Sequence, residues 1–179
     1  MSNTKNLKIV LATGIFYPDV GGPAIHVRKI AEALARKGHL VVVVAYGDSS
    51  GTSGATQPQF GQTQTGAGQE QFPFKVIRIS KKLPSFLRRL FYLSVIFKET
   101  PGAFALYAFN LTTAGLPVFL AGKLLRKKIL IRVAGDPIWE RIVEKGKRFV
   151  SFAKYYEQEL HKIDRPWLFR LIRFTLPRF

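Results

Sequence analysis

The sequence predicts an α/β fold built on a parallel, doubly wound sheet. Two patterns carry this prediction: short apolar runs typical of buried strands alternate with segments of helical periodicity, and a complete strand-helix-strand unit occupies the start of the chain. The composition agrees, because apolar residues make up 47% and aromatic residues 13% of the 179 residues, which excludes a disordered chain. We therefore expect a single domain over residues 1–179.

The first unit runs from a buried strand at 8–12, through a helix, to a second strand at 39–46. In the helical segment "AIHVRKIAEALARKG", apolar residues recur at helical spacing, and Gly38 is a C-terminal stop. The run "HLVVVVAY" is continuously apolar, as expected of a strand covered on both faces. A right-handed crossover makes the two strands parallel, with the helix packed on one face of the sheet.

Residues 47–71 break this pattern. Six glycines, many Gln, Ser and Thr residues, and only Asp48 and Glu70 as charged side chains are typical of a flexible surface loop. Such a long connection is either disordered or becomes ordered over a ligand. Disorder is the favoured interpretation, because Phe60 is the only aromatic residue that could anchor the loop.

Strands and helices alternate again after the loop. We expect strands at 74–80, 104–109 and 128–134, helices at 85–98 and about 113–126, the latter with Thr112 or Thr113 as N-cap, and a helical tail over about 137–179. The uncharged run 100–122 is long enough for a membrane helix, which is the alternative for this segment. Asn110, Gly115 and Pro117 would interrupt such a helix, whereas a strand, a polar turn and a helix accommodate all three.

The chain carries a net charge of +17, from 28 basic and 11 acidic residues. Between Gln71 and Gly135, Glu99 is the sole acidic residue against twelve basic ones: Lys75, Arg78, Lys81, Lys82, Arg88, Arg89, Lys98, Lys123, Arg126, Lys127, Lys128 and Arg132. Such a field attracts nucleic acid, an anionic membrane or a phosphorylated small molecule. The absence of cysteine excludes a disulfide framework and a thiolate metal site. The start "MSNTKNLK" lacks the apolar core of a signal peptide, so we expect a cytoplasmic protein.

Candidate site residues follow three of the predicted strands, where parallel sheets bind ligands. After the first strand, Gly21 and Gly22 would let a ligand approach the backbone, and the start of the next helix offers N–H groups to an anion. The alternative is that the two glycines only form a tight turn. No G-x-G-x-x-G stands at this position and no G-x-x-x-x-G-K-[ST] occurs in the chain, so NAD and P-loop chemistry have no support.

Three further side chains are candidates. His26, one turn into the helix, is either a ligand contact or a packing residue. Asp136 and Glu140 are four residues apart and would share a helix face, although Asp136 followed by Pro137 is also a common helix start. No Ser-His-Asp order, H-E-x-x-H motif or close set of His and acidic residues occurs, so nothing supports a protease or a metalloenzyme.

The stretch from Lys8 to Glu140 resembles the first domain of family 4 glycosyltransferases. Its opening matches that family's order of a strand, P-x-x-G-G, a helix ending in L-x-x-x-G-H, and a valine-rich strand, carried here by Pro18, Gly21, Gly22, Leu34, Gly38 and His39. The later segment "ALYAFNLTTAGLPVFLAGKLLRKKILIRVAGDPIWE" is also similar. The resemblance implies a GT-B architecture of two Rossmann-like domains, with the acceptor bound mainly by the first domain and the nucleotide-sugar donor mainly by the second.

The resemblance also implies roles for individual residues. Gly21 and Gly22 would border the donor's phosphates and transferred sugar. Asn110 and Asp136 would be the catalytic candidates, and the acceptor side would comprise His26, Gly135 and Glu140. The implied reaction is a retaining transfer to a glycan or lipid-linked acceptor, with no metal and with no cofactor besides the nucleotide-sugar substrate.

The second domain of that architecture should hold a basic pair for the diphosphate and an E-x7-E element. No such spacing occurs among Glu140, Glu144, Glu157 and Glu159. We therefore expect the chain to be half an enzyme, inactive alone, with its C-terminal donor-binding domain supplied in cis or in trans. The alternative is a non-catalytic basic module for nucleic acid or an anionic membrane. Nucleic acid is disfavoured, because no aromatic stacking motif or recognition helix stands out.

A last expectation concerns a membrane. Residues 81–98 combine Arg88, Arg89 and other basic residues with large apolar ones and contain no acidic residue, and residues 165–179 repeat this chemistry. Helices of this kind lie at the surface of an anionic bilayer. With Arg88 and Arg89 facing the lipid, the protein would be peripheral to the inner face of the plasma membrane. The alternative is that both apolar faces pack on the sheet or on the second domain.

Overall fold

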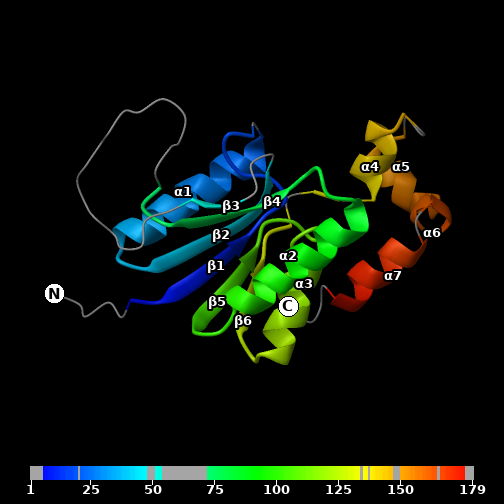
Figure 1. Ribbon diagram of the computed structural model, residues 1–179. Helices are drawn as coiled ribbons and strands as arrows, with labels where there is room; N and C mark the ends of the chain where they lie inside the picture. Colours follow the sequence, from blue (N-terminus) through cyan, green and yellow to red (C-terminus); the bar gives the residue numbers. More distant parts are fainter. Residues whose placement is uncertain are drawn as a thin grey trace.

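The computed structural model describes residues 6–19, 21–47, 51–53, 72–133, 135–136, 138–146, 150–164 and 166–175. A sheet lies between helices on both faces, and a group of short helices lies beyond one end of it (Figure 1). The sheet and its covering helices are β1 (Lys8–Ala12), α1 (Gly22–Arg36), β2 (Leu40–Gly47), β3 (Gly51–Ser53), β4 (Lys75–Ser80), α2 (Ser85–Glu99), β5 (Ala103–Ala108), α3 (Gly115–Leu124) and β6 (Lys128–Ile131). The predicted α/β class is confirmed.

The five strands β4, β2, β1, β5 and β6 are adjacent in that order and all parallel, which is the predicted doubly wound, Rossmann-like arrangement. β3 adds an antiparallel edge, with Gly51 opposite Arg78 and Ser53 opposite Val76. The expectation of a flexible loop throughout 47–71 is therefore wrong at 51–53. Pairing with a free strand edge uses backbone groups alone, so polar residues can form it. The other residues of that loop, 48–50 and 54–71, lie outside the described part.

Each face of the sheet has its own core. On one face, α1 packs through Ala24, Val27, Ala31 and Ala35, whose spacing of three or four residues makes one helical stripe. Phe16, Phe72 and Phe74 extend this core, with ring centroids 5.3 Å apart for Phe16 and Phe72. On the other face, α2 and α3 pack side by side and contribute Tyr92, Ile96, Val118 and Ala121.

The strand order places a topological switch point between β1 and β5. From β1 the chain passes over one face to β2 through α1, whereas β5 and β6 follow helices on the opposite face and extend the sheet on the other side of β1. Loops leaving β1 and β5 therefore diverge at the carboxyl ends of the strands, which is where sheets of this kind bind ligands.

One helix and one strand are shorter in the structure than predicted. The helix expected at 113–126 runs from Gly115 to Leu124, and neither Thr112 nor Thr113 is its N-cap. The N-cap is Ala114, which has no side-chain capping bond. The turn before it is held by Asn110, whose Oδ1 accepts hydrogen bonds from the backbone N–H groups of Thr113 and Ala114. The strand expected at 128–134 ends at Ile131. The run 100–122 forms β5, a turn and most of α3, and no helix among the described residues is long and apolar enough to cross a membrane.

The tail is helical, as predicted, and comprises α4 (Trp139–Glu144), α5 (Phe152–Glu157), α6 (Leu160–Asp164) and α7 (Pro166–Thr175). These helices lie beyond the carboxyl ends of the strands (Figure 1). They bury a core of their own, built from Ile138, Ile142, Tyr155 and Leu168. The tail therefore forms a small helical subassembly at the end of the sheet where a site is expected.

Candidate functional site

The first part of the site lies at the switch point, where Asn110 follows β5 and Gly14 follows β1. Oδ1 of Asn110 accepts from Thr113 N at 2.9 Å and from Ala114 N at 2.7 Å, which fixes the side chain. A Cβ built on Gly14 would lie 3.1 Å from Nδ2 of Asn110. The missing side chain of Gly14 thus lets the amide group reach the end of β1. Asn110 has a structural role through Oδ1, and its Nδ2 lies beside Gly14 at the end of β1.

The second part is the start of α1. The backbone of Gly21 is extended, a conformation that any residue adopts, and a Cβ on Gly22 would meet no atom within 4 Å. A tight turn that requires glycine therefore finds no support at Gly22. The first N–H groups of the helix have no acceptor inside it, because the first helical bond joins Ile25 N to Gly21 O. The helix start is open to a ligand at this point.

His26 is exposed and lies one turn after Gly22, on the same side of α1. No hydrogen bond to its side chain is found among the described residues, and it does not belong to the core on the α1 face. The packing alternative is therefore not supported by the structure. A role in ligand contact stays a prediction.

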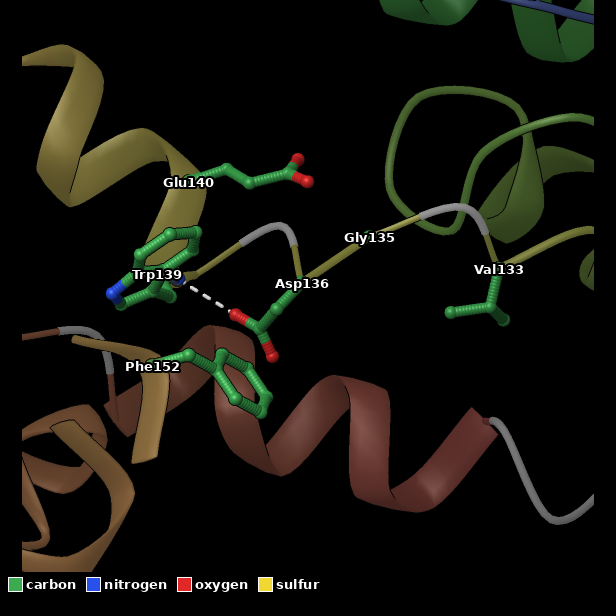
Figure 2. A pocket seen from close by; sticks show the side chains of 6 residues that line it. All are labelled: Val133, Gly135, Asp136, Trp139, Glu140 and Phe152. Atoms are coloured by element: carbon green, nitrogen blue, oxygen red, sulfur yellow. Dashed lines mark hydrogen bonds between the residues drawn. The ribbon is translucent and has the colours of Figure 1, made fainter. Parts of the chain in front are cut away.

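The third part is an open hollow of about 490 Å³ that follows β6 (Figure 2). Its lining comprises Val133, Gly135, Asp136, Trp139, Glu140 and Phe152. The rings of Trp139 and Phe152 meet edge to face, with centroids 5.9 Å apart. The three predicted residues Gly135, Asp136 and Glu140 thus share one site with two aromatic side chains.

Both carboxylate oxygens of Asp136 are occupied. Oδ1 accepts from Ile138 N at 2.9 Å and from Trp139 N at 2.6 Å, which places Asp136 at the start of α4. Oδ2 accepts from the hydroxyl of Tyr156 at 2.5 Å. Burial raises the pKa of Tyr156, and the hydrogen bond and negative charge of Asp136 raise it further, so the phenol stays a proton donor at neutral pH. These bonds favour the helix-start alternative for Asp136, and its predicted catalytic role remains a prediction. Pro137 lies outside the described residues.

Glu140 is the more available carboxylate of the hollow. Its side chain is exposed, and Figure 2 shows it extending over the same open space that Asp136 borders. A Cβ on Gly135 would collide with the Glu140 carboxylate, so the bare backbone at residue 135 leaves room for it. Glu140 can therefore accept hydrogen bonds from a ligand without giving up a contact that holds the fold.

Arg88 and Arg89, predicted to face a membrane, differ in their surroundings. Nη1 of Arg88 donates to Lys81 O at 3.0 Å, and the guanidinium lies 5.1 Å from the ring centroid of Tyr46. Arg88 is therefore half-buried against the protein, whereas Arg89 is exposed. Only Arg89 offers its charge directly to solvent.

Sequence reasoning missed Gly14, Trp139, Phe152 and Tyr156. Trp139 belongs to the motif "GDPIWE", which also contains the predicted residues Gly135, Asp136 and Glu140, so its place in the site could have been predicted from the sequence. Phe152 reaches the hollow, and Tyr156 reaches Asp136, only through the position of α5 beside α4, which no local pattern indicates. Among the described residues, no group of three or more His, Cys, Asp or Glu side chains could hold a metal ion.

Comparison of the chain with known protein families and with curated proteins finds no match.

Proposed function

We propose that this chain is the acceptor-side domain of a retaining GT-B glycosyltransferase of the family 4 type. It would move a sugar from a nucleotide-sugar donor to a glycan or lipid-linked acceptor, together with a donor-binding domain supplied in cis or in trans. One observation carries the proposal. The motif residues that follow β1, β5 and β6 lie at the same carboxyl edge of the sheet, on both sides of its switch point.

The hollow after β6 suits a sugar ring. Sugars present an apolar C–H face and a rim of hydroxyl groups, and pockets that bind them need aromatic surface with a few polar groups. Trp139 and Phe152 provide the aromatic surface, and the Glu140 carboxylate provides an acceptor for hydroxyl groups. Asp136 holds the turn beneath them through its bonds to α4 and to Tyr156.

The start of α1 suits the diphosphate of the donor. Free N–H groups and the positive end of the helix dipole favour an anion there. The open space over Gly22 lets phosphate oxygens come close to the backbone. In the transition state the same groups would stabilise charge that develops on the leaving phosphate, and Nδ2 of Asn110 would add a donor from the other side of the switch point.

The purified chain provides a test by two-dimensional NMR with amide assignments. We expect a nucleoside diphosphate to shift the amide signals of Gly22 and Ala24, and a panel of simple saccharides to shift those of Gly135 and Glu140. Glu140→Gln should weaken saccharide binding and leave the nucleotide response unchanged. The proposal fails if neither ligand class shifts these signals while duplex DNA binds with a steep salt dependence. Sugar transfer by the chain alone would instead show that no separate donor-binding domain is needed.

A further inference from the structure

Helix α2 is apolar on two sides, and only one of them packs on the sheet. Tyr92 and Ile96 are fully buried in the core, and the Tyr92 hydroxyl donates to the carbonyl groups of Thr13 and Val44 at 2.9 and 3.1 Å. This side anchors the helix. On the opposite side, four large residues of the first two turns are exposed: Phe86 by 71%, Leu87 by 43%, Leu90 by 46% and Phe91 by 53%.

The spacing of these four residues makes them one continuous patch. Phe86 and Leu90 are four residues apart, as are Leu87 and Phe91, so the two pairs form adjacent rows along the helix. The outer face of a surface helix is normally polar. The sequence left open whether the apolar side chains of this helix pack on the sheet. Tyr92 and Ile96 do so, whereas among the described residues no element covers the patch.

The charge around the patch is of one sign. Lys82, Arg89 and Lys98 are exposed, and no acidic residue occurs between Lys75 and Lys98. The next acidic residue, Glu99, is buried and pairs with Lys75 at 2.6 Å and with Lys8 at 3.3 Å. Lys81 pairs with Asp19 at 2.7 Å, so it is not part of the free charge.

We propose that the exposed face of α2 docks on an anionic lipid surface. Phe86, Leu87, Leu90 and Phe91 would enter the boundary between headgroups and acyl chains, and Lys82, Arg89 and Lys98 would contact the anionic headgroups. A nucleic acid would use the cations but leave the aliphatic side chains in water. A second copy of the chain would bring two surfaces of the same sign together, which is unfavourable at a net charge of +17.

Helix α7 has the same chemistry at the same end of the molecule. Leu168 faces the core of the tail, whereas Trp167 is 60% exposed and Arg170 and Arg173 are exposed. No acidic residue occurs in α7. Trp is enriched at membrane interfaces, because one end of its ring system is apolar and the other is polar. α7 thus carries the same combination of exposed aromatic and basic side chains as α2.

Vesicle flotation of the full chain tests the proposal, with vesicles of phosphatidylcholine alone and of phosphatidylcholine mixed with phosphatidylglycerol. We expect binding to the anionic vesicles only. The double variant Phe86→Ser with Phe91→Ser should lower the partition coefficient by at least about tenfold, because it removes the inserted side chains. Arg89→Glu should lower it by roughly tenfold, because it reverses one near-surface charge.

Two controls separate docking through α2 from general attraction of a basic protein. Lys37→Glu changes the net charge as much as Arg89→Glu but lies at the end of α1. Leu124→Ser removes an exposed apolar side chain at the end of α3. Both should bind as the unmodified chain does. Equal losses from Lys37→Glu and Arg89→Glu, equal binding to both vesicle types, or unchanged binding of the Phe86/Phe91 variant would overturn the proposal.

A fluorescence measurement tests insertion independently, in case the Phe86→Ser/Phe91→Ser variant does not fold properly. Phe91→Trp keeps an aromatic side chain at an exposed position, so the fold should be unaffected. Its fluorescence should shift to the blue on addition of anionic vesicles and be quenched by brominated acyl chains. No quenching beyond that of the unmodified chain would overturn insertion. A concentration-dependent blue shift without lipid would show that the patch joins two copies of the chain, which also overturns the proposal.

Discussion

The hydroxyl of Tyr156 donates a 2.5 Å hydrogen bond to Oδ2 of Asp136 and so joins helix α5 to the turn that follows β6. The other carboxylate oxygen of Asp136 holds the start of α4. One side chain therefore fixes two helices of the tail to the end of the sheet. The shape of the hollow depends on this connection, because Trp139 and Phe152 belong to these same two helices.

Replacing Tyr156 by Phe removes this hydrogen bond and leaves the ring packing in place. We expect the variant to lower the stability of the tail by about 1–3 kcal/mol, the usual range for a hydrogen bond to a charged group. Urea unfolding followed by tryptophan fluorescence measures this directly, since both tryptophans of the chain, Trp139 and Trp167, lie in the tail. Tyr17→Phe, in the loop after β1, is the control and should leave the transition unchanged.

The contribution of Tyr156 should also depend on pH. The pKa of Tyr156 is raised in the folded state, so the stabilisation is fully present below the ordinary tyrosine pKa of about 10 and is lost as the pH rises beyond it. The difference in unfolding free energy between the unmodified chain and Tyr156→Phe should be constant around neutral pH and shrink above about pH 10. A difference that grows in alkali would contradict the assignment of the hydrogen bond.

Much of the sheet could be predicted from the sequence, because its central strands β1, β2 and β5 are largely buried. The runs that became β2 and β5 are continuously apolar, and a helix of clear periodicity separates β1 from β2. The short strand β3 could not be predicted, since its pairing with β4 uses backbone groups alone and its sequence is polar. The end of β6 was placed too late, because "KILIRVA" stays apolar beyond the last paired residue, Ile131.

The site was predictable only where its residues are close in sequence. The spacing of Gly135, Asp136 and Glu140 placed them together, and the structure finds them in one hollow. Phe152 and Tyr156 come from a later helix, so their position depends on tertiary packing within the tail. The double occupation of Asp136 could not be foreseen either, because its second oxygen bonds to a residue twenty positions away.

A second prediction concerns Glu99, which joins the end of α2 to Lys75 of β4 and Lys8 of β1. Burial alone would raise the pKa of Glu99, but the hydrogen bond and charge of Lys75, together with Lys8, lower it overall. Glu99→Gln should therefore cost about 1–2 kcal/mol of unfolding free energy at neutral pH. Because the folded-state pKa is depressed, this stabilisation is present above the ordinary glutamate pKa of about 4.3 and is lost as the pH falls further.

Chemical unfolding of both proteins across the acidic range tests this prediction. The two unfolding curves should approach each other as the pH falls below about 4, and they should meet once the pH is below the depressed folded-state pKa, where the carboxylate is protonated in both states. Glu32→Gln is a suitable control, since Glu32 forms its ion pair with Arg28 on the surface of α1, where such pairs contribute at most about 0.5 kcal/mol. An equal loss from both variants would indicate a general charge effect instead.

A third prediction separates the two ends of the Asn110 side chain. Asn110→Asp keeps an acceptor for Thr113 N and Ala114 N and removes the Nδ2 donor, whereas Asn110→Ala removes both. We expect the Ala variant to lose about 1 kcal/mol of stability and the Asp variant to stay close to the unmodified chain. In the proposed two-domain enzyme both variants should lose sugar transfer if Nδ2 acts as a donor. Full transfer by Asn110→Asp would reduce the role of this residue to capping the turn.

The last prediction compares two glycines in helices. A Cβ on Gly22 would meet nothing within 4 Å, whereas a Cβ on Gly122 of α3 would lie 2.5 and 2.7 Å from side-chain atoms of Ile129. Gly122→Ala should therefore cost about 1–3 kcal/mol through overpacking between α3 and β6.

Gly22→Val should change the unfolding free energy by no more than about 0.5 kcal/mol, as is usual for an exposed position. Yet its branched side chain would cover the first N–H groups of α1. The proposed two-domain enzyme should therefore lose transfer, and the isolated chain should lose its response to nucleoside diphosphate. If Gly22→Val destabilises the chain as much as Gly122→Ala does, or if it leaves diphosphate binding intact, the helix start does not bind the donor.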